Sequence, residues 1–288
     1  MSSTVSTSRA WGARAGWWRA SLLLGVTVCA AGLTGGPILA EARDPLPPDR
    51  AGPLDLEGLD PGAARRRAQA EEARKPKVPV SAHLGARRGY LEAALRARPE
   101  DPELCFALAK VLHLQGVDGD EQAAERAEDL LDAVLARRPK EPLVLAYRGS
   151  AHLLAAKRVW FWNKGERVER GLVLLDRAVA LTPETHEQHL EVRFLRGVSC
   201  YALPFFFDRG EQARADLATV GAGAEAAARA GRMDPLVAAA ALFYDGVCKA
   251  EAGEQTAARD AFAAAAALAP GSSHGRAAKA RLEADRDG

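Results

Sequence analysis

The chain has 288 residues, of which 48% are hydrophobic and 27% are charged, a composition that excludes a generally disordered protein and allows one or two globular domains. Its formal net charge is +1, and it becomes −2 when Arg9, Arg14 and Arg19 are left out. The remainder contains no long run of Lys and Arg, which excludes nucleic-acid binding through a basic surface. Ala, Leu, Arg and Glu, which favour helices, fill most of the later chain, so the expected fold class is all-α.

An apolar segment flanked by arginines opens the chain. The three arginines precede an uncharged stretch over residues 20–40, and the small residues Ala40 and Ala42 lie at its end, as in a secretory signal peptide. We therefore predict a signal peptide over residues 1–42 and an exported protein, periplasmic or extracellular. Two alternatives stay open: an uncleaved N-terminal membrane anchor, because the stretch is about long enough to cross a bilayer, and lipidation of Cys29.

Closely spaced prolines characterise residues 43–80, and proline interrupts helices and central strands. We predict an irregular tether there, with one short charged helix over residues 63–75. The basic triplet at residues 65–67 is offset by Glu71 and Glu72, so the tether does not create a basic surface either.

Three cysteines, Cys105, Cys200 and Cys248, follow the predicted signal peptide. Their odd number, wide separation and lack of a CxxC motif argue against a disulfide framework and a zinc site. Each lies in an apolar helical stretch, so we expect buried free thiols. A single disulfide is the alternative in an oxidising compartment.

The segment near the C-terminus combines small, aromatic and proline residues at a spacing that helix pairs use. The offsets 0, 7, 12, 16, 19 and 24 are occupied by Gly246, Gly253, Ala258, Phe262, Ala265 and Pro270. This pattern resembles the tetratricopeptide repeat (TPR), a pair of helices of about 34 residues that touch through small residues and end at a proline. The unit departs from the family at Asp245, where Leu is usual, and at Lys249, where an aromatic residue is usual.

The same frame fits three upstream units and a preceding half-unit. The matching residues are Ala109, Gly116, Ala127, Leu131 and Pro139, then Gly149, Leu175, Ala178 and Pro183, then Gly197, Ala213 and Leu217, and in the half-unit Leu91, Ala94 and Pro99. The three units need six, ten and four extra residues, which we place in the turn between the first and second helix. The resemblance implies a TPR-like helical-repeat solenoid of about ten helices over residues 81–285.

Six aromatic residues fall in the extra segments of two neighbouring units: Trp160, Phe161, Trp162, Phe205, Phe206 and Phe207. Stacked repeats place equivalent turns side by side, so we expect these rings to be neighbours at one edge of the solenoid. Two interpretations stay open. The rings bury one another and the repeat edge, or part of the cluster stays exposed and receives a partner.

The resemblance also implies a groove, lined by the first helices, that binds an extended peptide. The positions expected in it are mostly apolar: Phe106, Lys110, His113, Ala146, Ser150, Phe194, Val198, Phe243 and Val247. The carboxylate clamp of chaperone-binding TPR proteins needs groove asparagines. It is not expected here, because Asn163, the only asparagine of the chain, lies in an extra segment.

Two short motifs match enzyme signatures only by their letters. GSSHG at residues 271–275 fits GxSxG, and GAGAEA at residues 221–226 fits a dinucleotide-binding fingerprint, but no strand is expected before either. We therefore interpret both as loop glycines. We expect no enzyme activity, no cofactor and no metal.

The predicted function is that of a non-enzymatic exported scaffold that binds another protein or peptide in the cell envelope. It binds no nucleic acid, and it meets the membrane only if the N-terminal anchor is retained. A carrier of a small apolar ligand or lipid is the alternative, and an enzyme is the least supported. The expected partner-binding residues are Phe106, Lys110, His113, Trp160, Phe161, Trp162, Phe194, Val198, Phe205, Phe206 and Phe243.

Overall fold

Helix is the only regular structure among the residues that the computed structural model describes. These are residues 63, 66, 67, 70, 74 and 75, residues 84–156 and residues 161–287, with the side chains of 161–164, 286 and 287 excepted. The predicted signal peptide lies outside them, as does most of the tether. The tether residues at 63, 66, 67, 70 and 74 are helical, in agreement with the short helix expected over residues 63–75.

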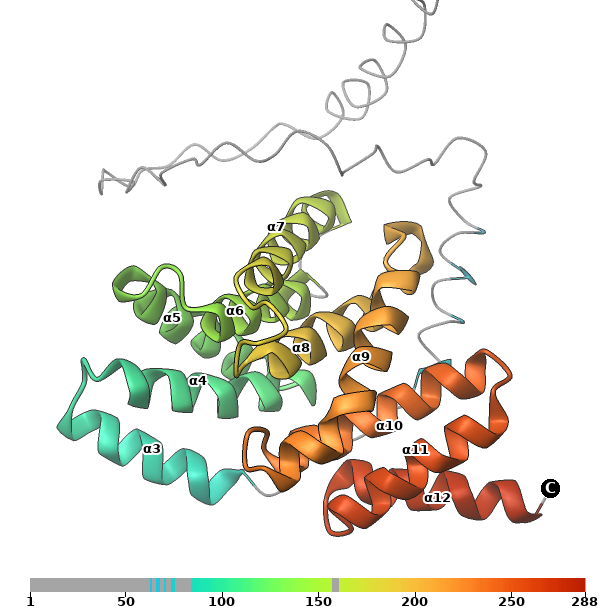
Figure 1. Cartoon of the computed structure of the whole chain (residues 1–288). Helices are drawn as coiled ribbons and strands as arrows, with labels where there is room; N and C mark the ends of the chain where they lie inside the picture. Colours follow the sequence, from blue (N-terminus) through green and yellow to red (C-terminus); the bar gives the residue numbers. More distant parts are fainter. Residues whose placement is uncertain are drawn as a thin grey trace, which may run out of the picture. The chain divides into compact units, whose positions relative to one another are not determined.

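Ten α-helices and one 3₁₀ helix follow one another along residues 84–156 and 161–287 (Figure 1). They are α3 (Gly85–Ala97), α4 (Pro102–Val117), α5 (Glu121–Arg137), α6 (Pro142–Ala156), α7 (Phe161–Ala180), α8 (His189–Ala202), η1 (Phe205–Phe207), α9 (Gly210–Arg229), α10 (Pro235–Glu251), α11 (Gln255–Leu268) and α12 (Ser273–Asp287). The predicted all-α fold with about ten helices is confirmed.

Aspartate and proline set where several helices begin. Asp101 accepts hydrogen bonds from the backbone N–H groups of the next turn of α4, and Asp234 does the same for α10. Each is followed by a proline, whose missing N–H costs nothing at the first helical position. These local signals mark where the helices begin without any tertiary contact.

The helices pack in sequential pairs. The most extensive contacts join α4 to α5, α6 to α7, α8 to α9 and α10 to α11, and each second helix then packs on the first helix of the next pair. The first helices α4, α6, α8 and α10 also contact one another in order, and α12 covers α10 and α11 at the C-terminal end. The fold is therefore a helical-repeat solenoid.

Small residues allow the two helices of a pair to approach closely. A Cβ added to Gly149 of α6 would lie 2.7 Å from the carbonyl oxygen of Gly171 in α7, and one added to Gly246 of α10 would lie 2.8 Å from the Phe262 ring of α11. Only glycine fits at such distances. The residue spacing that indicated the repeat thus corresponds to real crossing points.

The expected location of the extra residues was wrong for two units. Only three residues separate α4 from α5, and α7 already begins at Phe161 and runs for 20 residues. The extra segment around Trp162 therefore lengthens a helix instead of forming a connection, because it continues in helix-favouring Lys, Glu and Arg without a proline. Only the Phe205–Phe207 segment lies between two helices, as the 3₁₀ helix η1.

Two glycines of α7 test the close packing on α6. Gly171→Ala should lower the free energy of unfolding by about 1–3 kcal/mol, because the new methyl group must displace the backbone of Gly149. Gly165→Ala is the matched control: a Cβ there meets nothing within 4 Å, so it should raise the free energy of unfolding by about 0.5–1 kcal/mol. Urea unfolding measures both. Equal effects of the two variants would contradict the packing.

Candidate functional site

An aromatic group connects the first helices of the first two pairs. The Tyr147 ring on α6 meets Phe106 of α4 edge to face, with 5.6 Å between the ring centroids, and His113 of α4 at 5.3 Å. The Lys110 ammonium lies 5.0 Å from the centroid of the Phe106 ring, within the range of a cation–π interaction. Phe106 and Lys110 are half-buried, so this part of the first-helix face remains accessible.

Behind this group, a line of hydrogen bonds crosses three first helices. His113 Nε2 lies 2.9 Å from Ser150 Oγ, and the Ser199 hydroxyl donates to Ser150 Oγ at 3.0 Å. His113 is only 3% exposed, and burial lowers its pKa to about 4. The imidazole is therefore neutral at pH 7, and it joins α4 to α6 as part of the packing.

A carboxylate shares the first-helix face with Lys110. The Tyr147 hydroxyl donates to Glu191 Oε1 on α8 at 3.4 Å. Burial raises the pKa of Glu191, and the charge of Lys110 and the Tyr147 hydrogen bond oppose that rise. Glu191 and Lys110 thus place opposite charges beside an aromatic surface.

The C-terminal first helices carry a second aromatic group, centred on Tyr244 of α10. Its ring centroid lies 6.5 Å from that of Phe194, 5.9 Å from that of Tyr201 and 5.6 Å from that of His274. Phe194 and Tyr244 are half-buried.

The other residues expected in the groove fall into two classes. Val198 is half-buried, as are Phe106, Lys110 and Phe194. Phe243 is 1% exposed and packs against Phe262, so it belongs to the core, as His113 does. Core burial also applies to three further positions: Ala146, Ser150 and Val247. The accessible part of the predicted groove is smaller than the repeat frame implies.

The three phenylalanines of η1 form one continuous half-buried group. The ring centroids of Phe205 and Phe206 are 5.7 Å apart, and those of Phe206 and Phe207 are 4.9 Å apart. We call these residues the η1 corner. Trp160 lies outside the described residues, and so do the side chains of Phe161 and Trp162, although both have helical backbones. The predicted contact between the two aromatic triplets therefore stays a prediction.

Tether residues contact the region around the η1 corner, which the sequence did not indicate. The Arg67 guanidinium carbon lies 3.9 Å from the centroid of the Phe205 ring. Lys75 Nζ donates to the carbonyl oxygen of Leu203 at 3.0 Å and lies 5.6 Å from the centroid of the Tyr201 ring. One face of the corner is thus already occupied by a cation of the same chain.

Ion pairs of two largely buried arginines link successive helix pairs, and residue spacing alone did not predict them. Arg148 on α6 bonds Asp132 of α5 through two nitrogens at 2.6 and 2.8 Å, and it bonds Glu128 at 2.7 Å. Arg196 on α8 bonds Asp216 of α9 at 2.6 and 2.9 Å and Asp176 of α7 at 3.0 Å. Each arginine thus joins its own helix to carboxylates of neighbouring second helices.

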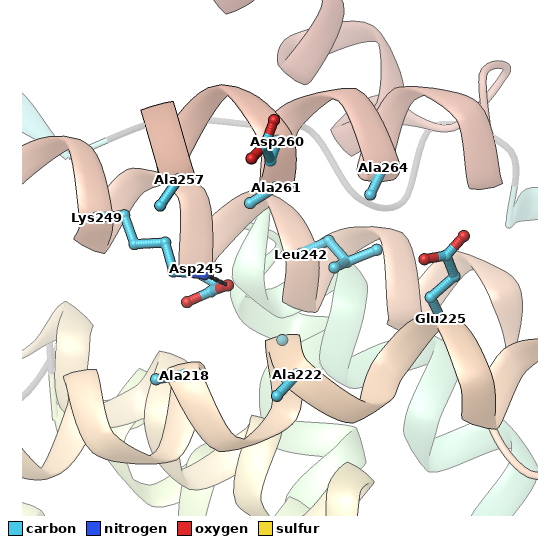
Figure 2. A pocket seen from close by; sticks show the side chains of 11 residues that line it. Ala218, Ala222, Glu225, Leu242, Asp245, Lys249, Ala257, Asp260, Ala261 and Ala264 are labelled. Carbon is cyan, nitrogen blue, oxygen red and sulfur yellow. Dashed lines mark hydrogen bonds and ion pairs between the residues drawn. The ribbon is translucent and has the colours of Figure 1, made fainter. Parts of the chain in front are cut away.

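A pocket of about 360 Å³ lies between α9, α10 and α11 (Figure 2). Small side chains form most of its wall: Ala218, Gly221, Ala222, Ala257, Ala261 and Ala264. Glu225, Asp245 and Asp260 bring carboxylates from the three helices, and Lys249 brings an ammonium. Lys249 Nζ donates to Asp245 Oδ2 at 2.6 Å.

The structure can be compared with three expectations from the sequence, on two short glycine motifs and on the cysteines. Residues 221–226 were expected in a loop, but they lie inside α9, where Gly221 allows the Asp245 side chain to pack closely. The GSSHG motif at residues 271–275 begins α12, and Ser272 Oγ accepts from the N–H of Gly275. The three cysteines are free and buried, as predicted.

Neither a metal site nor a membrane span is found in the parts of the chain that the structure describes. No three or more His, Cys, Asp and Glu side chains gather there in a way that could hold a metal ion. No helix among the described residues has both the length and the apolar character needed to cross a bilayer.

The buried imidazole of His113 predicts acid sensitivity. Its folded-state pKa of about 4 lies below the usual value of about 6.5, so the unfolded chain binds a proton first as the pH falls. The free energy of unfolding should therefore fall between pH 6.5 and pH 4, by about 3 kcal/mol from this residue. His113→Gln should make the decrease shallower in urea unfolding at pH 7, 5.5 and 4.5. An unchanged slope would contradict the burial.

Comparison with known proteins finds no family model, no curated protein and no solved structure that matches this chain. The fold is a helical-repeat solenoid, and the TPR resemblance stays a prediction from residue spacing.

Proposed function

We propose that the chain is a non-enzymatic, exported TPR-like scaffold that binds another protein in the cell envelope. The observation that carries this proposal is the half-buried aromatic surface of the solenoid, on the first-helix face and at the η1 corner. Such rings bring large contact areas to an interface at a small entropic cost and are common anchors of protein–protein binding. Because one fold can host many functions, identification of a bound partner is the test of this proposal.

The first-helix face supports this function by combining aromatic area with charge. Phe106 and Phe194 present half-buried ring surface, and Lys110 and Glu191 stand beside it with opposite charges. An interface that couples an apolar contact to a few polar groups favours a partner of defined chemistry. Because α4, α6 and α8 follow one another in the solenoid, these residues offer separate contacts to an extended segment.

The carrier alternative has less support. Among the residues that line the pocket between α9, α10 and α11, only Leu242 has a large apolar side chain, and the others are small or charged. Pockets that bind apolar ligands are mostly lined by hydrophobic and aromatic side chains. A scaffold is therefore the function that the described surfaces favour.

Aromatic truncations test the binding function. Phe206→Ala should reduce recovery of a stoichiometric partner, co-purified with the exported chain, at least tenfold, because it removes the central ring of the η1 corner. It should lower the free energy of unfolding by about 1–3 kcal/mol, less than the full cost of a buried Phe. Tyr90→Ala, on a side chain that is 74% exposed on α3, is the matched control and should change neither quantity much.

Trp160→Ala and Trp162→Ala extend this test to the other aromatic triplet. If these tryptophans dock a partner, the variants should lose partner binding with little loss of stability, because exposed aromatics cost little to remove. Thermal melts beside Phe206→Ala measure the stability. Equal stability losses in all three variants, with partner recovery unchanged, would overturn the docking role.

Export has an independent test. The arginine-flanked apolar segment predicts that protein recovered from outside the cytoplasm begins near residue 41 or 43 rather than at Met1. N-terminal sequencing of that material decides the question. An N-terminus at Met1 in membrane-bound material would favour the uncleaved anchor, and recovery from the cytoplasm alone would contradict export.

A further inference from the structure

Three glycines mark the same position in successive helix pairs. Each lies opposite one large side chain of its second helix: Gly149 faces Leu175, Gly197 faces Leu217 and Gly246 faces Phe262. The residues just before the glycines are therefore equivalent as well. They are Arg148, Arg196 and Asp245.

In two of the three pairs, this equivalent residue is an arginine held by a carboxylate of the preceding second helix. Arg148 bonds Asp132 of α5, and Arg196 bonds Asp176 of α7. These two aspartates are also equivalent, because each directly follows the leucine at the crossing point of its helix. The solenoid thus has a recurrent site for a guanidinium group between consecutive second helices.

In the last pair, both equivalent positions carry other residues. Asp245 stands where the arginine is expected, and Ala218 of α9 stands where the aspartate is expected. Asp245 is 2% exposed, and it is shorter than arginine by several atoms. Ala218 and Asp245, which occupy the two equivalent positions, both line the pocket between α9, α10 and α11 (Figure 2).

The charges of this pocket suit a cation. Three carboxylates, those of Glu225, Asp245 and Asp260, line it together with one ammonium group, that of Lys249. Lys249 bonds Asp245 Oδ2 but extends from the next turn of the same helix and is about a third exposed. Glu225 also pairs with Arg229, whose side chain is largely exposed. Acidic groups thus outnumber the basic group that lines the pocket.

We infer that this pocket binds an arginine side chain presented by a partner protein. The partner arginine takes the space that Arg148 and Arg196 occupy in the preceding pairs, and its guanidinium donates to the carboxylates of Asp245 and Asp260. The inference rests on the proposed binding function and names the chemistry of the partner. An arginine is favoured over a lysine, because its planar guanidinium can bond two carboxylates at once.

An arginine peptide tests the pocket directly. The probe is acetyl-Gly-Arg-Gly-amide, titrated into the full chain while the amide resonances of Gly221 and Ala261 are followed by NMR. The expected result is saturable shifts at both amides. The matched probe with citrulline in place of arginine keeps the shape but lacks the charge, and it should bind at least tenfold more weakly.

Two variants link any binding to the pocket. Asp245→Asn removes the buried charge at constant size and should weaken peptide binding at least fivefold. The double variant Ala218→Asp with Asp245→Arg reinstates the internal pair seen at Asp132 and Arg148, so it should fill the pocket and abolish binding. A cooperative thermal melt of each variant verifies that it folds.

The outcomes separate this inference from the proposed function. Absence of saturable shifts, equal binding of the citrulline peptide, or full binding by the double variant would each overturn the arginine site. If that happens while Phe206→Ala still abolishes partner recovery, the scaffold function stands and its partner uses the η1 corner alone. If peptide binding is as expected but no stoichiometric partner is found, the pocket stands and the scaffold function fails.

Discussion

The close crossing of the two helices in each pair is the constraint on which the other features depend. At the crossing of α6 and α7, no side-chain atom fits between Gly149 and the Gly171 carbonyl group. Successive residues of a helix are rotated by about 100°, so a glycine at the crossing directs its neighbour sideways, toward the space between second helices. The arginines at 148 and 196 reach carboxylates of neighbouring helices for this reason.

The buried charges that result have to be satisfied in full. Asp216 is 1% exposed and accepts hydrogen bonds from both Arg193 and Arg196, so its desolvation is offset by two cations and good geometry. Breaking such a cluster would leave an uncompensated buried charge, which is far more costly than losing an exposed pair. The arginines therefore help to specify which helices pack together. At the equivalent position of the last pair, the negatively charged Asp245 replaces the arginine.

Residue spacing predicted helix pairs correctly where the spaced residues have a physical role at the helix crossing. Gly246, Phe262 and Pro270 indicated a helix pair because a crossing needs a small residue, a large neighbour and an end, and all three leave marks in the sequence. The length of α7 left no such mark. A helix that grows by several turns without a proline or a cap cannot be distinguished from a helical insertion in a loop by counting residues.

The site was only partly predictable for a related reason. The repeat frame assigns Phe106, His113 and Phe243 to the same helix face, but burial depends on how closely the neighbouring first helices approach. His113 and Phe243 lie in the core, whereas Phe106 stays half-buried. The tether contact of Arg67 with Phe205 joins parts of the chain more than 130 positions apart, and no local pattern encodes it.

Two kinds of group bind arginine side chains within this chain. Carboxylates hold Arg148 and Arg196 between the helix pairs, and the Phe205 ring holds Arg67 at the η1 corner. A partner that approaches Phe205 must either displace Arg67 or use the half-buried rings of Phe206 and Phe207. A partner arginine in the pocket at Asp245 would meet the same carboxylate chemistry that the solenoid already uses internally. The two surfaces therefore suit different groups of a partner: apolar side chains at the η1 corner, and a cation of defined shape at the pocket.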